Sequence, residues 1–106
     1  MSRGEIYWAD LDAPAGRRPV CVLTRSAAVE VLSGIVCAPI TRTTRGIRSE
    51  VPVGPAQGLP EESVINCDTV ITLPKKRLSK SPIGRLDAAA TIHLDQALRY
   101  ALEIRW

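Results

Sequence analysis

The chain has 106 residues, the size of one domain, with a net charge of +3, and carries 45% hydrophobic but only 4% aromatic residues. Phe is absent, so the core is expected to consist of Val, Ile, Leu and Ala. No apolar stretch approaches the ~18 residues that a membrane-spanning helix needs, and nothing resembles a signal peptide. We therefore expect a cytoplasmic protein that does not associate with a membrane.

The positive charge is concentrated in the middle of the chain. Residues 17–85 contain eleven basic and five acidic residues, a net charge of +6, whereas the two ends together contain three basic and six acidic residues, a net charge of −3. A basic midsection suits the phosphate backbone of a nucleic acid. An ordinary solvated surface is the alternative interpretation of the same charge count.

Three cysteines, Cys21, Cys37 and Cys67, each lie in an apolar run that is typical of a strand, and none has Cys-x-x-Cys spacing. This pattern predicts buried thiols in a reducing compartment rather than disulfides or a metal site. The single histidine, His93, lies among apolar residues near the end of the chain and is expected to be structural as well.

The first half of the chain predicts two strands and a short helix. Apolar and polar residues alternate within residues 3–11, which predicts a strand, and a Pro and a Gly in residues 12–16 predict a loop. Residues 18–24 are almost continuously apolar and predict a buried strand antiparallel to the first. Ser26 is expected to cap one or two helical turns that end by residue 32.

Residues 34–44 are the stretch around which the rest of the chain is expected to be arranged. Their first half is an apolar run of β-forming residues, and their second half becomes polar at Thr41 and basic at Arg42. Such a strand delivers hydroxyls and a guanidinium from a rigid support. Pro39 has no N–H for a ladder, which predicts an edge position or a bulge there.

The second half predicts three further short strands. Residues 46–53 alternate and contain a Pro, which favours an exposed edge strand, and residues 54–60 hold two Gly and two Pro and form a loop. Residues 63–68 and 83–86 are expected to be strands. Residues 73–81 are expected to form a basic turn or short helix.

The chain ends with a predicted helix over residues 88–103, for which Asp87 is a natural N-cap. One face of this helix is apolar, with Leu94, Leu98, Ala101 and Leu102. One good helix after several short strands predicts an α+β fold, most simply a small curled sheet or partly closed barrel with the helix packed against it.

Three polar residues stand at the ends of predicted strands: Arg18, Thr41 and Asp68. Each alone is ordinary for its position. Together they supply a guanidinium, a hydroxyl and a carboxylate, which can bind a phosphodiester, stabilise charge at phosphorus and move a proton. Neither a metal nor another cofactor is needed if the ribose 2′-OH of RNA is the nucleophile, and DNA would not be cut.

The sequence resembles the MazF/PemK family, the toxins of type II toxin–antitoxin modules. The resemblance covers nearly the whole chain in order, and it is carried by Arg3-Gly4-Glu5-Ile6, Arg17-Arg18-Pro19-Val20 with Val22-Leu23, Ala38-Pro39-Ile40-Thr41, Ser63-Val64 before Asn66-Cys67-Asp68, Ile83-Gly84, and the terminal Leu-rich helix.

The resemblance implies a small SH3-like (MazF/CcdB-like), partly closed antiparallel β-barrel with a C-terminal helix. It implies a homodimeric cytoplasmic endoribonuclease that cuts single-stranded RNA at short sequences without a metal and leaves a 2′,3′-cyclic phosphate and a 5′-OH. The RNA would be messenger RNA, with ribosomal and transfer RNA as alternatives. A MazE-like antitoxin would block the RNA groove.

The family's catalytic residues fall on Arg18 and Thr41, and the Asp of its PemK-like members falls on Asp68. Two features depart from the family pattern: the loop over residues 12–16 is short, and Asn66 stands where PemK-like members have an Arg. Arg17, Arg42 or Arg45 could compensate for that missing Arg. With few aromatic residues, base stacking would depend on Tyr7 and Trp8. The candidate RNA-binding residues are Arg17, Arg25, Arg42, Arg45, Arg48, Asn66, Lys75, Lys76 and Arg77.

Two other functions remain open on the sequence alone. Toxins with the same barrel poison DNA gyrase by protein–protein contact, and in such a protein the last residues, Ile104-Arg105-Trp106, would form the binding surface. A third possibility is an RNA-binding module that does not cut, because Asn66 replaces the Arg. The Arg-Pro and Pro-Ile-Thr motifs argue for the nuclease.

Overall fold

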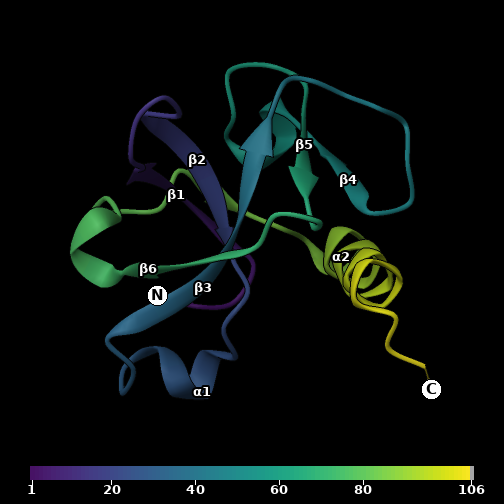
Figure 1. Ribbon diagram of the computed structural model, residues 1–106. Coiled ribbons are helices and arrows are strands. Elements are labelled where there is room, and N and C mark those ends of the chain that lie inside the picture. Colours follow the sequence, from purple (N-terminus) through teal and green to yellow (C-terminus); the bar gives the residue numbers. More distant parts are fainter. Residues whose placement is uncertain (106) are drawn as a thin grey trace.

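The computed structural model describes residues 1–105 and shows a curled antiparallel sheet with helices at its two sides (Figure 1). Seven strands pair in the order β4-β5-β3-β2-β1-β7, and β6 lies beside β3. This α+β arrangement with a C-terminal helix is the predicted fold. The strands are β1 (Glu5–Asp10), β2 (Arg17–Val22), β3 (Gly34–Thr41), β4 (Glu50–Val53), β5 (Ser63–Asn66), β6 (Ile71–Pro74) and β7 (Gly84–Arg85). The helices are α1 (Ser26–Val29), the 3₁₀ turns η1 (Pro55–Gln57) and η2 (Lys75–Arg77), and α2 (Ala88–Leu102).

Strand β3 is shared by the two halves of the sheet. On one side it pairs with β2, and on the other its residues 34–37 pair with β6 and its residues 40–41 pair with β5. Pro39 lies between these two ladders, where that side of β3 has no partner. Of the two expected arrangements, an edge position or a bulge, the edge position was wrong, because β3 is a central strand. Its proline is tolerated because the ladder on that side is interrupted there.

Three local predictions differ from the structure. Residues 46–49 belong to a loop and turn, and only β4 is a strand, although it lies at the edge of the sheet as its Pro52 predicts. Residues 71–74 form β6, which was not predicted: residues 71–72 were assigned no element and residues 73–74 were placed in the basic turn, because three β-forming residues are too few to give a clear alternation. Ser26 does not cap α1: the N-cap position is Arg25, and the Ser26 hydroxyl accepts a hydrogen bond from the Arg3 N–H at 3.0 Å.

The core has two parts, one on each face of the curled sheet. One part packs α2 against β3, β4 and β5, with Leu94 and Ala97 of the helix among the buried residues. The other part lies between β1, β2, β3, β6 and α1. Aliphatic side chains fill both, as the composition predicts; the largest of them are Ile6, Ile35, Ile40, Ile65, Leu94, Val20, Val22, Val29 and Val51.

The three cysteines are buried and free, as predicted. Burial raises the pKa of Cys21 and of Cys37 to about 12 and that of Cys67 to about 11. The thiols therefore stay protonated at neutral pH and behave as small apolar groups. His93 lies on α2, and its side chain is exposed rather than part of the core.

Helix α2 begins as predicted, with the Asp87 carboxylate accepting a hydrogen bond from the Ala90 N–H at 2.8 Å. Of the predicted apolar face, Leu94 is buried and Leu98 and Ala101 are partly buried, whereas Leu102 is 55% exposed at the last turn. None of the helices in residues 1–105 has the length and apolarity that crossing a bilayer requires.

We predict that Asp87→Ala lowers the free energy of unfolding by about 1 kcal/mol, because it removes the side-chain cap of α2. Urea denaturation measures the change. Gln96→Ala, an exposed position in the same helix, is the matched control and is expected to change stability by less than ~0.5 kcal/mol. Equal effects of the two substitutions would contradict the importance of the cap.

Candidate functional site

The sheet brings Arg18 and Thr41 together. The register of β2 and β3 pairs Val20 with Pro39, Cys21 with Ala38 and Val22 with Cys37. The ladder ends at Val20 and Pro39; Arg18, two residues earlier in β2, and Thr41, two residues later in β3, both line the same two hollows beyond this end. Two of the three residues expected to be catalytic therefore line the same hollows from neighbouring strands.

Arg18 and Thr41 line two adjoining hollows of the surface, one of about 950 Å³ and one of about 390 Å³. The Arg18 side chain is exposed, and its Nε donates a hydrogen bond to the Ala15 carbonyl at 3.3 Å. The Thr41 Oγ1 accepts a hydrogen bond from the Thr43 N–H at 3.2 Å, which leaves its own proton for another acceptor. Both groups can therefore reach one anionic ligand.

The smaller hollow has an aromatic and basic wall. The Arg17 guanidinium lies over the Trp8 ring, 5.2 Å from its centroid, and Arg42 forms an exposed ion pair with Glu61. All four residues line this hollow. Trp8 thus lines the hollow, as far as its prediction as a base-stacking residue requires, with Arg17 over its ring. The expectation for Tyr7 was wrong, because its side chain is only 3% exposed in the core.

The larger hollow is lined by several further polar residues predicted to bind RNA. Arg77 lies in it, but its guanidinium donates hydrogen bonds to the Asp12 carboxylate at 3.0 Å and to the Asp10 carbonyl at 3.3 Å. Arg45 and Asn66 also line it. The short loop over residues 12–16 contributes to the same wall.

Asp68 does not line either hollow. It follows β5, and its carboxylate accepts a hydrogen bond from the Ser49 hydroxyl at 2.5 Å, while its N–H donates to the Asn66 Oδ1 at 2.9 Å. Its side chain therefore holds the turn before β4 and makes no hydrogen bond with Arg18. The structure places Asn66, rather than Asp68, in the same hollow as Thr41.

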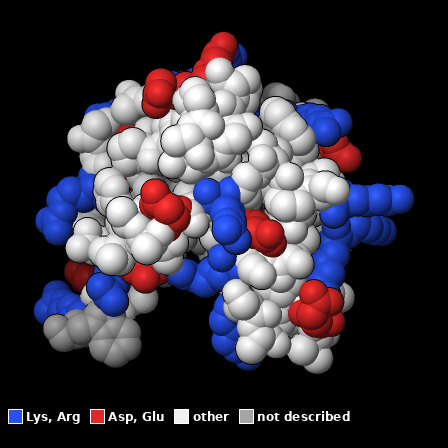
Figure 2. Space-filling view, turned by 180° about the vertical axis from the view of Figure 1, so that it is seen from behind, with Lys and Arg blue, Asp and Glu red and all other residues white. Residues whose placement is uncertain are grey.

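Four other candidate RNA-binding residues lie away from the two hollows. Arg25 precedes α1, Lys75 and Lys76 belong to η2, and the Arg48 guanidinium stacks over the Tyr100 ring of α2 at 4.5 Å. On the side of the molecule opposite to the view of Figure 1, basic and acidic side chains are interspersed around uncharged surface (Figure 2). Positive charge is therefore not confined to the site.

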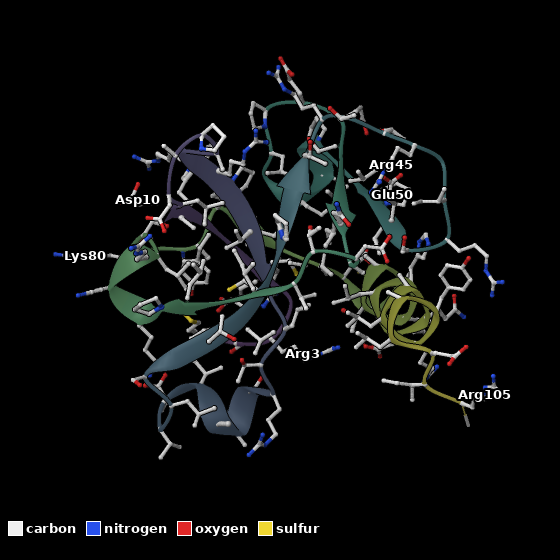
Figure 3. The ribbon with its side chains drawn as sticks, viewed as in Figure 1. Arg3, Asp10, Arg45, Glu50, Lys80 and Arg105 are labelled. Carbon is white, nitrogen blue, oxygen red and sulfur yellow. The ribbon has the colours of Figure 1, made fainter. Side chains whose placement is uncertain are left out.

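One residue that the sequence analysis did not single out is Glu50, at the start of β4. Its side chain is only 3% exposed and accepts hydrogen bonds from the N–H groups of Arg45 and Gly46, both at 3.0 Å, and from the Arg45 Nε at 3.3 Å. Figure 3 shows Glu50 and Arg45 side by side. A charged residue opening an otherwise apolar strand was the signal that could have identified it.

The pKa of Glu50 reflects two opposing effects. Burial raises the pKa of the carboxyl, but the hydrogen bonds from the backbone and side chain of Arg45 and from the backbone of Gly46 and Ile47 together outweigh burial and lower it below its usual value of 4.5. The carboxylate is therefore ionised at neutral pH. Within residues 1–105, no three His, Cys, Asp or Glu side chains are grouped in a way that would hold a metal ion.

Comparison with known proteins identifies the family. Residues 2–102 match the family described as "PemK-like, MazF-like toxin of type II toxin-antitoxin system". The chain belongs to this family. Its fold is the one that the resemblance of the sequence implied.

Relatives within the MazF family are similar over almost their whole length. The chain is 39% identical to "Endoribonuclease MazF3" of Mycobacterium tuberculosis over 101 residues, which cover 95% of this chain and 94% of the relative. Among solved structures, "Mycobacterium tuberculosis toxin MazF-mt6" is 37% identical with a TM-score of 0.89 and coverage of 96% and 99%. "Endoribonuclease in complex with its cognate antitoxin from Mycobacterial species" is 27% identical, with a TM-score of 0.86 and coverage of 100% and 98%.

We predict that Glu50 makes the stability of this MazF-like chain sensitive to acid. Because the folded-state pKa is lowered, the carboxylate stabilises the fold above its unfolded-state pKa near 4.5, and this contribution is lost as the pH falls through the folded-state value. Urea unfolding of the wild type and of Glu50→Gln between pH 7 and pH 3 measures it. The difference in unfolding free energy between them should shrink below about pH 4.5; a constant difference would contradict the prediction.

Proposed function

We propose that this chain is a toxin that cuts single-stranded RNA at specific short sequences in the cytoplasm. The observation that carries the proposal is that Arg18 and Thr41, from the neighbouring strands β2 and β3, line the same two hollows, which are large enough for nucleotides. The similarity to relatives such as "Endoribonuclease MazF3" supports it. The substrate class is messenger RNA, with ribosomal and transfer RNA as alternatives.

In the proposed reaction, the 2′-OH of the RNA attacks the adjacent phosphorus and the bond to the leaving 5′ oxygen breaks. The products are a 2′,3′-cyclic phosphate and a 5′-OH, and the 2′-OH proton is balanced by the proton that the leaving oxygen takes up. DNA is not cut because it lacks this hydroxyl. Neither a metal nor another cofactor takes part.

Arg18 and Thr41 would act on the phosphate in this reaction. The guanidinium offers N–H donors in a planar fork that matches two phosphate oxygens, and it stabilises the negative charge that develops on them. The Thr41 hydroxyl donates a hydrogen bond to the same phosphate. Both groups are held on strands rather than on a loop, so that little reorganisation is needed as the charge develops.

Asp68 would support the site indirectly. Its hydrogen-bond partners are Ser49 and Asn66, so we assign its carboxylate to holding the turn before β4 rather than to accepting the 2′-OH proton. Asn66, held through its Oδ1, presents its amide N–H₂ group for an acceptor on the RNA.

A homodimer and a MazE-like antitoxin are the proposed protein partners. Exposed apolar side chains offer surface for both: Val31, Leu32, Val36, Ile47, Ile92, Tyr100, Leu102 and Ile104. An acidic antitoxin segment would compete with RNA for the basic residues around the two hollows. The similar mycobacterial endoribonuclease, whose structure was solved in complex with its cognate antitoxin, supports this proposal.

The gyrase-poisoning alternative has no support among the known relatives, which are endoribonuclease toxins. Of the three terminal residues it would use, Ile104 and Arg105 are exposed, and Trp106 lies outside the described residues. Incubating the purified protein with RNA in EDTA separates the functions. Cleavage supports the nuclease, whereas intact RNA together with inhibition of gyrase would overturn it.

We predict that Arg18→Ala lowers kcat for RNA cleavage by on the order of 10²–10³-fold, because it removes the main donor to the charged transition state. Cleavage of a short fluorogenic RNA measures kcat. Arg85→Ala, an exposed arginine outside both hollows, is the matched control and should cut at the wild-type rate. Near-normal cleavage by Arg18→Ala would refute the assignment.

We predict that Asp68→Asn affects folding more than chemistry. Weakening its hydrogen bond with Ser49 should lower the unfolding free energy by about 1 kcal/mol, while kcat at saturating RNA stays within about threefold of the wild-type value. Urea denaturation and single-turnover cleavage measure the two quantities. A loss of kcat as large as that of Arg18→Ala, without loss of stability, would instead make Asp68 a catalytic residue.

A further inference from the structure

Among the described residues, Glu50 is the one charged residue that the fold buries. A buried carboxylate is costly unless donors compensate for its lost hydration. Here the donors come from one place: the Arg45 and Gly46 N–H groups meet at its Oε1, and the Arg45 Nε meets its Oε2. The carboxylate is therefore the centre around which the loop between β3 and β4 is folded.

The backbone of this loop turns at Gly46, which has a φ of +68°. This left-handed conformation brings two successive N–H groups toward one oxygen, and a glycine adopts it without strain. The Glu50 N–H also donates to the Ile47 carbonyl at 3.0 Å, which closes the turn. The loop thus has a defined shape although residues 42–48 are exposed.

The side chain that this arrangement directs is Arg45. Its Nε is bound by Glu50, and the terminal nitrogens of its guanidinium supply four more N–H donors. Arg45 lines the larger hollow together with Thr41, Thr43 and Asn66. The β4–β5 register pairs Glu50 with Asn66, so the buried carboxylate belongs to the strand pair that carries Asn66, while Arg45 and Asn66 themselves line the hollow.

Arg45 offers a replacement for the Arg that PemK-like members have at the position of Asn66. A guanidinium reaches the wall beside Asn66, but it comes from the preceding loop rather than from β5. An arginine on an exposed loop loses conformational freedom when it binds a phosphate, which weakens binding. Glu50 restricts Arg45 before RNA arrives, because two of the hydrogen bonds to its carboxylate come from Arg45 itself, one from the backbone N–H and one from Nε.

We propose that Glu50 is a positioning residue for RNA binding: its buried carboxylate shapes the loop over residues 42–49 and directs the Arg45 guanidinium to an RNA phosphate in the larger hollow. The proposal rests on the proposed function and adds to it the residue that binds a phosphate next to the one held by Arg18 and Thr41. Arg45 takes the place of the Arg missing at position 66.

The test compares Glu50→Gln, Arg45→Ala and the double variant in steady-state cleavage of a fluorogenic RNA. Gln keeps the size of Glu but turns an N–H₂ group toward N–H donors. Glu50→Gln and Arg45→Ala should each raise KM about tenfold and leave kcat within about twofold, because a phosphate contact is lost. The double variant should be no worse than Arg45→Ala alone.

Salt dependence gives a readout that a merely structural role would not change. Loss of one phosphate contact to single-stranded RNA should make the slope of log(kcat/KM) against log[salt] shallower by about 0.7 in both single variants. If the effect of Glu50→Gln persists undiminished in the Arg45→Ala background, or if its salt slope is that of the wild type, the proposal is overturned.

Gly46→Ala is the second variant, for use if Glu50→Gln does not fold. It changes no charge, and nothing lies within 4 Å of the added Cβ, so that it acts only through the strained φ of +68°. Gly46→Ala should raise KM, as Arg45→Ala does; an unchanged KM would overturn the proposal. Arg18→Ala separates a failure of the proposed function from a failure of the Glu50 proposal. Near-normal cleavage by Arg18→Ala would refute the proposed function, whatever the Glu50 variants show.

Discussion

The antiparallel register of β2 and β3 is the constraint on which the site depends. With Val20 opposite Pro39, the start of β2 and the end of β3 lie beyond the same end of this ladder, where Arg18 and Thr41 line the same hollows. A shift of one residue would turn every side chain of the strand to the other face and separate Arg18 from Thr41. The buried residues Val20, Cys21 and Val22 hold this register, because a shift would also expose them to water. Packing of the core thereby fixes the geometry of the proposed chemistry.

Much of the fold follows from short-range patterns. The apolar runs around Cys21 and Cys37 and the capped amphipathic helix after Asp87 give the main elements at nearly their true bounds. The edge position offered for Pro39 was wrong because the sequence shows that an N–H is missing but not that β5 and β6 leave a gap beside a central strand. Strand β6 was missed because pairing with β3, rather than local preference, holds its four residues extended.

The site was predictable to the extent that strand ends determine it. Arg18 and Thr41 line the same hollows because both lie at the ends of strands that are neighbours in the chain. Asp68 was expected beside them for the same reason, yet it lies past the end of β5, where the chain turns and its carboxylate contacts Ser49. The environment of Glu50 depends on the folded loop before it, and no spacing in the sequence indicates that three donors converge on one carboxylate.

Several arginines around the two hollows already have acidic neighbours of their own. Arg77 is bound by Asp12, and Arg42 by Glu61. In a MazF-like nuclease, a phosphate that binds one of these arginines must then displace a carboxylate. The free energy gained is only the difference between the interaction of the guanidinium with the phosphate and its interaction with the carboxylate. These internal ion pairs lower the affinity of the arginines for polyanions in general. They favour a strand that fits the whole groove and can exchange all of these partners together.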